Sequence, residues 1–332
     1  MQISFPSVDS YSAIGAGFFT LASRSQTMCT PFHTTRNRTL IQIALLIFGV
    51  FCCATAAIAI RMSGIHNVTL SALRLLVAAL VLTPVFVREY RKHCESYTRH
   101  DLLATIWPGI LLGIHFITWI AGIRMTTVVN GNLLVNMVPI AMPFFLLFLL
   151  RERLTAREWC ATGIAIAGMT LLIGCDFAIS REFFAGDIVC FVSMLFFCFY
   201  LALSRKYRHV KSIWLYVVPL YYVAAFFCLL ASVFWGLVMD RNVLPQFFPA
   251  KEWIWIVYLG IVPTVIGHSI LNYSMKKLRG QVVSILTMGE FIFAGTMAYF
   301  FFAQVPHWSL YAAGVLLLIS GIMVASGEHS SD

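Results

Sequence analysis

Two ionisable side chains interrupt long apolar stretches of the sequence: Arg74 within residues 68–87 and Glu290 within residues 281–303. A charged group in hydrocarbon is costly unless it faces a cavity or a partner, so each is a candidate functional residue. Arg74 could hold a substrate carboxylate or phosphate in a two-pronged contact. A structural role is equally compatible with its position, since it could extend to the membrane interface or cap a buried carbonyl.

Glu290 has the chemistry of a proton carrier. A carboxyl group in a low-dielectric helix bundle resists ionisation, so it can take up and release a proton at physiological pH. We therefore predict that Glu290 is a proton-coupling residue. The alternative is a buried ion pair or a hydrogen bond to a neighbouring helix.

His115 and His268 are the two histidines inside apolar segments. Trp119 follows the first by four residues and Asn272 follows the second by four, so each pair lies on one face of its helix. The two histidines fall at similar depths of the third and eighth apolar segments. We predict that all four side chains line one cavity built from both halves of the chain, with interhelical hydrogen bonding as the alternative.

Amides begin the fourth apolar segment. Asn132 and Asn136 are separated by four residues and so share a helix face. Amides suit the recognition of polar groups, and we predict that both contact substrate. Asparagine side chains also join neighbouring helices in membranes.

Catalytic and metal-binding motifs are missing from the sequence. It contains no HExxH, no GxSxG and no Walker phosphate loop. Most of the nine cysteines fall inside apolar runs, where a free cysteine behaves as a small hydrophobe. We predict no catalytic residue, no cofactor and no metal site.

The composition is that of a membrane protein. Hydrophobic residues make up 60% of the chain and charged residues 11%, and the mean hydropathy is +0.85. A helix needs roughly 20 apolar residues to cross hydrocarbon, and ten segments meet that length. We therefore predict an all-α, polytopic fold of ten transmembrane helices. The segments are 40–60, 68–87, 102–123, 128–150, 158–175, 186–204, 213–238, 253–274, 281–303 and 308–326.

The basic residues are unevenly distributed between these segments. The N-terminal extension and the loops after the second, fourth, sixth and eighth segments carry seventeen of the 23 Lys and Arg residues. Basic loops stay on the cytoplasmic side, so both termini are predicted to be cytoplasmic in a cell (inner) membrane. The net charge of +9 then faces anionic lipid headgroups, and nucleic acid is not an expected partner.

The two halves resemble each other at an offset of about 152 residues. Asn136 to Pro139 is followed by Glu152, and Thr287 to Phe291 is followed by Gln304. Because each half has an odd number of segments, homologous halves must lie in the membrane with opposite orientations. Inverted repeats are typical of carriers, which bind substrate between the halves and alternate the side of access.

We predict four regions. Residues 1–39 form an N-terminal cytoplasmic extension, for which a targeting segment or a misassigned start upstream of Met28 are alternatives. Residues 40–175 form the first five-helix repeat, residues 186–326 the second, and residues 327–332 a cytoplasmic tail.

Several short patterns resemble a known family: Leu73-Arg74-Leu75, Asn136 to Pro139, Arg151 to Thr155, and Gly163 with Gly168. Over residues 40–326 the chain is similar to the drug/metabolite transporter superfamily, in particular its two-domain EamA type. The second half departs from the family pattern, with Phe291 where a proline is common and Gln304 where an acid is common.

The resemblance implies a secondary active transporter that moves a small polar metabolite, such as an amino acid, an amine or a nucleotide-derived compound. Export or exchange by alternating access is the expected mode, with proton coupling as an option. The competing classes are an integral membrane enzyme and a non-transporting receptor or scaffold. Neither of these needs two inverted halves.

Overall fold

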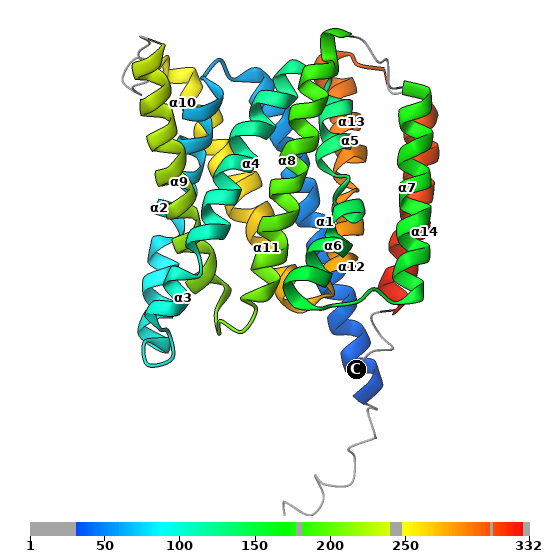
Figure 1. Ribbon diagram of the computed structural model, residues 1–332, viewed down its shortest axis with the longest axis horizontal. Helices are drawn as coiled ribbons and strands as arrows, with labels where there is room; N and C mark the ends of the chain where they lie inside the picture. Colours follow the sequence, from blue (N-terminus) through cyan, green and yellow to red (C-terminus); the bar gives the residue numbers. More distant parts are fainter. Residues whose placement is uncertain (1–30, 177–180, 240–247, 306–307, 328–332) are drawn as a thin grey trace, which may run out of the picture.

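A computed structural model describes residues 31–176, 181–239, 248–305 and 308–327. In these residues the secondary structure is helical, and the long helices stand side by side in one bundle (Figure 1). The all-α class predicted from composition is confirmed. The first half consists of α1 (Pro31–Met62), α2 (Asn67–His93), α3 (Arg99–Leu103), α4 (Ile106–Met125), α5 (Val128–Val135), α6 (Val138–Leu150) and α7 (Ala156–Asp176).

The second half has a matching order of helices and one irregular stretch. A π-helical segment, η2 (Gly260–His268), interrupts its third long helix. The elements are α8 (Arg181–Lys206), α9 (Ile213–Val238), α10 (Ala250–Leu259), η2, α11 (Ser269–Lys277), α12 (Gly280–Thr287), α13 (Glu290–Phe302) and α14 (Trp308–Gly327).

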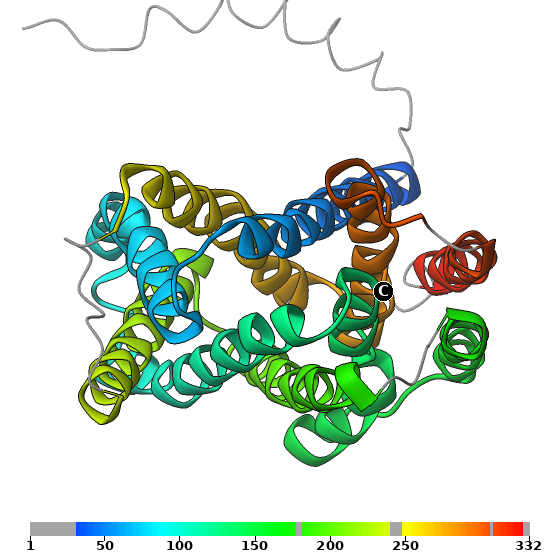
Figure 2. The same ribbon diagram turned by 90° about the horizontal axis from the view of Figure 1, so that it is seen from above.

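Eight helical stretches within the described residues are long and apolar enough to cross a membrane. Between 44% and 72% of each spanning window is buried, so the helices present apolar side chains both to one another and to their surroundings. That is the pattern expected where lipid replaces water as the solvent. The other two predicted segments correspond to α7 and α14, which pack against each other at one edge of the bundle (Figure 2).

The inverted repeat is visible in the backbone. Arg151 ends α6 and Ala303 ends α13 with left-handed φ angles of 55° and 53°, the two positive values among described non-glycine residues. These positions are 152 residues apart, which is the offset predicted from sequence. The next residues also match, since the amide of Glu152 donates to Leu146 and that of Gln304 to Ala298. Both helices therefore end in the same hydrogen-bonded turn.

Helix packing follows the same symmetry. Three pairs join equivalent elements of the two halves: α2 with α9, α7 with α14, and the α5–α6 unit with the α12–α13 unit. The packing of α4 on α8 is repeated by that of α1 on η2 and α11 (Figure 2). The two halves therefore pack closely against each other, and helices from both form the centre of the bundle.

The fourth helix of each half is broken near its middle. α5 ends at Asn136 and α6 begins at Val138, with Pro139 in its first turn, where a missing amide hydrogen costs nothing. In the second half the break falls at Met288 and Gly289, just before Glu290. The side chains of Asn136 and Glu290, one at each break, both line the space at the centre of the bundle.

The predicted basic loops lie together at one end of the bundle, the lower end in Figure 1, which we call the basic end. The turns α2–α3, α6–α7, α8–α9 and α11–α12 meet there, as does the start of α1. Arg61, Arg124 and Lys251 lie at the opposite end.

Candidate functional site

A small cavity of about 20 Å³, with room for about one water molecule, lies where the two halves meet. Its lining comes from helices of both halves, and its polar side chains are all buried. The cavity is therefore closed in this structure and must widen to admit a metabolite. Its polar lining consists of Arg74, His115, Trp119, Asn136, His268 and Glu290, with Cys53, Phe197, Pro263 and Leu271 among the other lining residues.

Arg74 lies at the centre of this site with a fully buried side chain, so it does not extend to the membrane interface. Its Nε and Nη2 atoms donate to Thr264 Oγ1 at 3.1 and 3.0 Å, and its guanidinium carbon lies 4.2 Å from the centre of the Phe116 ring. Its Nη1 atom has no hydrogen-bond partner. Between described residues Arg74 forms no ion pair within 4.0 Å. The result is a buried, oriented cation with one free donor group.

The π-helical segment positions the acceptor for Arg74. Pro263 has no amide hydrogen to offer the Leu259 carbonyl, and the Thr264 hydroxyl donates to that carbonyl at 2.7 Å. The lone pairs of the same hydroxyl are then available to Arg74. Tyr221 completes the arrangement by donating to the Thr264 carbonyl at 3.0 Å.

His115 is fixed by Ser193 of α8. Its Nδ1 atom lies 3.2 Å from the Ser193 carbonyl oxygen, which only accepts, so Nδ1 is assigned the proton. The Ser193 hydroxyl donates to the His115 carbonyl at 2.9 Å. The Trp119 ring lies parallel to the imidazole, with an interplanar angle of 11° and 6.2 Å between centroids, and its Nε1 atom has no partner.

His268 lies in the same cavity, with its ring centroid 6.4 Å from that of His115. Its Nδ1 atom has no hydrogen-bond partner. The two histidines, which come from different halves and from helices about 150 residues apart in the sequence, therefore meet at the centre of the bundle.

Glu290 is the first residue of α13 and lies beside the side-chain amide of Asn136, at the two helix breaks. It interacts electrostatically with Arg74 without contacting it in an ion pair. The Asn136 Nδ2 atom donates to the Asn132 carbonyl at 2.9 Å, while its Oδ1 atom is unpartnered. The cavity thus holds one basic and one acidic side chain, both buried.

The structure places Asn132 and Asn272 outside the cavity lining. Asn132 Nδ2 donates to the Val128 carbonyl at 2.9 Å, one turn back on its own helix. Asn272 Nδ2 donates to the His268 carbonyl at 2.7 Å and to the Tyr200 hydroxyl. The bond from Asn272 to Tyr200 joins two helices, which was the alternative raised for Asn272, whereas the bond from Asn132 stays within its own helix.

Sequence reasoning missed two polar residues of the site. Thr264 orients Arg74, and its position directly after Pro263 in an apolar segment was an available signal. Ser193 holds His115, but a lone serine in an apolar segment carries no such signal. The described residues contain no group of three or more His, Cys, Asp or Glu side chains placed to hold a metal ion.

Comparison with known proteins matches the chain along its length. A sequence model of the EamA-like transporter family matches residues 40–174 and 184–327. An uncharacterized transporter of Archaeoglobus fulgidus is 25% identical over 296 residues, which cover 86% of this chain and 96% of that protein. The uncharacterized transporter YyaM of Bacillus subtilis is 22% identical over 86% of this chain and 93% of its own length.

Two further similarities are narrower in what they show. A biotin transporter of Escherichia coli is 27% identical over 105 residues, which are 31% of this chain and 33% of that protein. A solved structure titled "Crystal structure of protein" aligns with a TM-score of 0.69 and 16% identity, covering 87% of this chain and 98% of its own. At that identity the likeness concerns the fold alone.

Proposed function

This chain belongs to the EamA-like transporter family, and we propose that it is a secondary active transporter that carries a small polar metabolite across a membrane by alternating access. It is an integral, multi-pass membrane protein, and the relatives that cover most of its length are named transporters. Membership of the family does not specify the substrate, the direction of transport or the coupling ion.

One observation carries the proposal: a closed polar cavity between the halves, lined by side chains whose hydrogen bonds are unfulfilled. Arg74 Nη1, Trp119 Nε1, Asn136 Oδ1 and His268 Nδ1 all lack partners there. Each unsatisfied buried polar group costs about 1–3 kcal/mol. A polar substrate would satisfy several of them at once, which supports a binding site rather than a structural core.

The architecture provides a way to open this cavity to either side. The site lies at the interface of two inverted repeats and next to the two broken helices, where a rocking movement exposes it alternately at the two ends. The basic end carries most Lys and Arg residues, so we place it in the cytoplasm of a cell with the protein in the cell (inner) membrane. Both termini are then cytoplasmic.

Glu290 is the group that we assign to proton coupling. It is buried in the cavity and, between described residues, is not held in an ion pair that would keep it ionised. Arg74, also unpaired, lines the same cavity and interacts with it electrostatically. Loss or gain of a proton at Glu290 therefore changes the net charge of the cavity and its affinity for a charged substrate, which links proton movement to substrate movement.

The experiment is a thermal-shift screen of the purified full-length protein, followed by flux in liposomes. Amino acids, nucleotides, sugars and amines are tested, because a ligand that binds the folded state raises its apparent stability. A compound that raises the unfolding midpoint and is then carried into liposomes supports the proposal. Folded protein that neither binds nor carries any of these classes contradicts it and favours a receptor, a scaffold or an enzyme.

A further inference from the structure

Two of the unpartnered groups in the central cavity are donors that cannot accept a hydrogen bond. Arg74 Nη1 and the indole Nε1 of Trp119 are both without partners, and both side chains are at least 96% buried. The titratable groups that face Arg74 are Glu290, Cys53, Tyr221, Cys228, His115 and His268, and between described residues none forms an ion pair with it. The cavity therefore contains an unpaired buried cation and two donor groups without acceptors.

Both donors are held in place before any ligand arrives. Thr264 and the Phe116 ring fix the plane of the guanidinium, and the parallel His115 ring fixes the indole. The Nε–Nη2 edge of Arg74, which would suit a bidentate contact, is already occupied by Thr264. The remaining donors are one Nη1 group and one indole N–H, enough for the two oxygens of a carboxylate. A phosphate would need more.

We infer that the transported substrate is a small carboxylic acid whose carboxylate is held by Arg74 Nη1 and Trp119 Nε1. This inference rests on the proposed transport function and names its substrate class. Glu290 and the Asn136 Oδ1 atom stand in the same cavity as acceptors, so they favour acids that also carry N–H groups.

The test compares acids with their neutral amides on the full-length protein. The probe pairs are leucine and leucinamide, nicotinate and nicotinamide, and biotin and biotinamide. In at least one pair the acid is expected to raise the unfolding midpoint at a concentration about tenfold lower than the concentration that the amide requires. The amide binds more weakly because it lacks the charged oxygen that accepts the hydrogen bonds of the site. Trp119→Phe keeps an aromatic side chain, smaller than the indole, and removes the N–H donor; it should weaken binding of that acid by about tenfold. Trp159→Phe, at an exposed position of α7, is the matched control.

The inference is overturned if no acid is preferred to its amide, or if Trp119→Phe binds like Trp159→Phe. These results are separate from failure of transport itself. If sugars or amines bind and are carried while acids are not preferred, the transport function stands and the carboxylate inference falls. If nothing is bound or carried, both fall.

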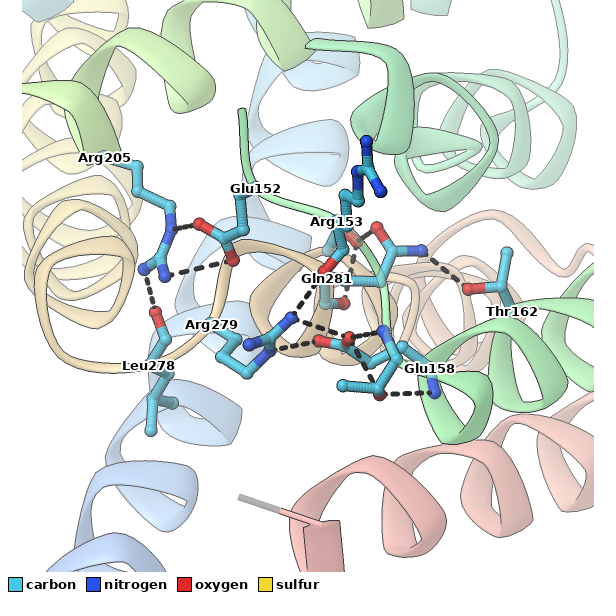
Figure 3. Close-up of polar contacts among 10 residues, drawn as sticks. Glu152, Arg153, Glu158, Thr162, Arg205, Leu278, Arg279 and Gln281 are labelled. Atoms are coloured by element: carbon cyan, nitrogen blue, oxygen red, sulfur yellow. Dashed lines mark hydrogen bonds and ion pairs between the residues drawn. The ribbon is translucent and has the colours of Figure 1, made fainter. Parts of the chain in front are cut away.

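A second observation, independent of the cavity, concerns the basic end. Two buried or half-buried ion pairs join the halves there (Figure 3). Arg205 of α8 donates to Glu152, which follows α6, at 2.6 and 3.1 Å. Arg279, between α11 and α12, donates to Glu158 of α7 at 2.6 and 2.9 Å. Each acid belongs to the first half and each arginine to the second.

Other contacts strengthen this junction. Arg205 also donates to the carbonyls of Met275 and Leu278, and Arg279 donates to the Arg153 carbonyl at 3.0 Å. Glu158 in addition closes the capping box that starts α7, through Thr155. The α6–α7 turn is therefore tied to the α11–α12 turn (Figure 3).

The opposite end repeats half of this arrangement. Arg61 donates to the carbonyls of Ile123 and Thr126. These two residues lie 152 positions before Met275 and Leu278, which are the carbonyl partners of Arg205. Arg61 is therefore the counterpart of Arg205. The counterpart of Glu152 is Gln304, which has no charge to offer. Between described residues at the opposite end, the hydrogen bonds that connect the two halves come from neutral donors. The Ser63 hydroxyl donates to Glu252 at 2.8 Å, and the Thr126 hydroxyl donates to Asp187 at 2.6 Å.

We propose that the Glu152–Arg205 and Glu158–Arg279 pairs form a latch that must break each time the cavity opens at the basic end. Breaking such a pair in a low-dielectric setting leaves two poorly solvated charges, so the latch slows opening at that end. Between described residues the opposite end has no such pair across the halves, so we assign the higher barrier to opening to the basic end.

Cys53, which lines the cavity, can report on opening. The other cysteines are replaced, and a small membrane-impermeant thiol reagent is applied from each side of oriented vesicles. Glu152→Gln copies the residue present at the opposite end and should raise the labelling rate of Cys53 from the basic end several-fold. Glu158→Gln should do the same, since glutamine can keep the capping box.

Glu95→Gln is the matched control, because Glu95 is an exposed acid in the α2–α3 turn at the same end. The latch proposal is refuted if Glu152→Gln and Glu158→Gln label at the rate of the control. It is also refuted if labelling rises equally from both sides, which would indicate general loosening of the fold.

Discussion

Replacing Thr264 by valine removes the hydroxyl that orients Arg74 while keeping the size and branching of the side chain. In the structure this hydroxyl takes part in three hydrogen bonds: two from Arg74, at 3.1 and 3.0 Å, and one to the Leu259 carbonyl, at 2.7 Å. Valine makes none of these, and Arg74 is then left buried with three unfulfilled nitrogen atoms. Thr264→Ser keeps the hydroxyl and is the matched control.

The cost can be estimated from the three lost hydrogen bonds. Side-chain hydrogen bonds in membrane proteins average about 0.6 kcal/mol, so three amount to about 2 kcal/mol. We therefore expect Thr264→Val to lower the free energy of unfolding by about 2 kcal/mol.

The assay has two readouts. Unfolding of the purified protein in detergent reports the loss of stability, and flux in liposomes reports the loss of orientation at Arg74. If Arg74 binds the substrate carboxylate, KM should rise about tenfold in Thr264→Val and stay near the native value in Thr264→Ser. A valine variant as stable and as active as the serine variant would refute the reasoning, because Arg74 would then be held by other contacts.

Three further predictions follow from the same geometry. Glu290→Gln should abolish flux driven by a pH gradient in liposomes and leave substrate exchange intact; driven flux at the native rate would remove Glu290 from the coupling step. Gly122→Ala should destabilise the fold by about 1–3 kcal/mol, because a Cβ there would lie 2.5 Å from the Cys190 sulfur of α8. Gly163→Ala in α7 has open space around it and should leave the unfolding midpoint unchanged or raise it, because alanine favours a helix more than glycine does. Asn136→Ala should raise KM because Asn136 lines the cavity. Asn272→Ala should lower the unfolding midpoint without changing KM, because the hydrogen bonds of Asn272 go to Tyr200 and His268. The reverse pattern would show that the substrate passes Asn272 and not the cavity.

The sequence alone determined the class of the fold and its symmetry. A bilayer requires helices of about 20 apolar residues, so their number and order can be counted. The 152-residue offset between Asn136–Glu152 and Met288–Gln304 was also readable, because the same helix break and the same terminal turn need the same local sequence. The cost of charge in hydrocarbon also marked Arg74 and Glu290 as candidate functional residues, although it left open whether Arg74 is buried or extends to the membrane interface.

Only the tertiary structure decided which polar groups meet. Spacing places His115 and Trp119 on one face of a helix, and both line the cavity. The same spacing relates His268 and Asn272, yet only His268 lines the cavity, while Asn272 donates to Tyr200. In lipid both faces of a helix are apolar, so the sequence does not mark the inward face as it does in a soluble protein. The partners Thr264 and Ser193, and the ion pairs of Glu152 and Glu158 with arginines more than 50 residues away, depend on how the two inverted halves pack against each other. That packing is set by shape and hydrogen bonds over the whole bundle, and not by any local pattern.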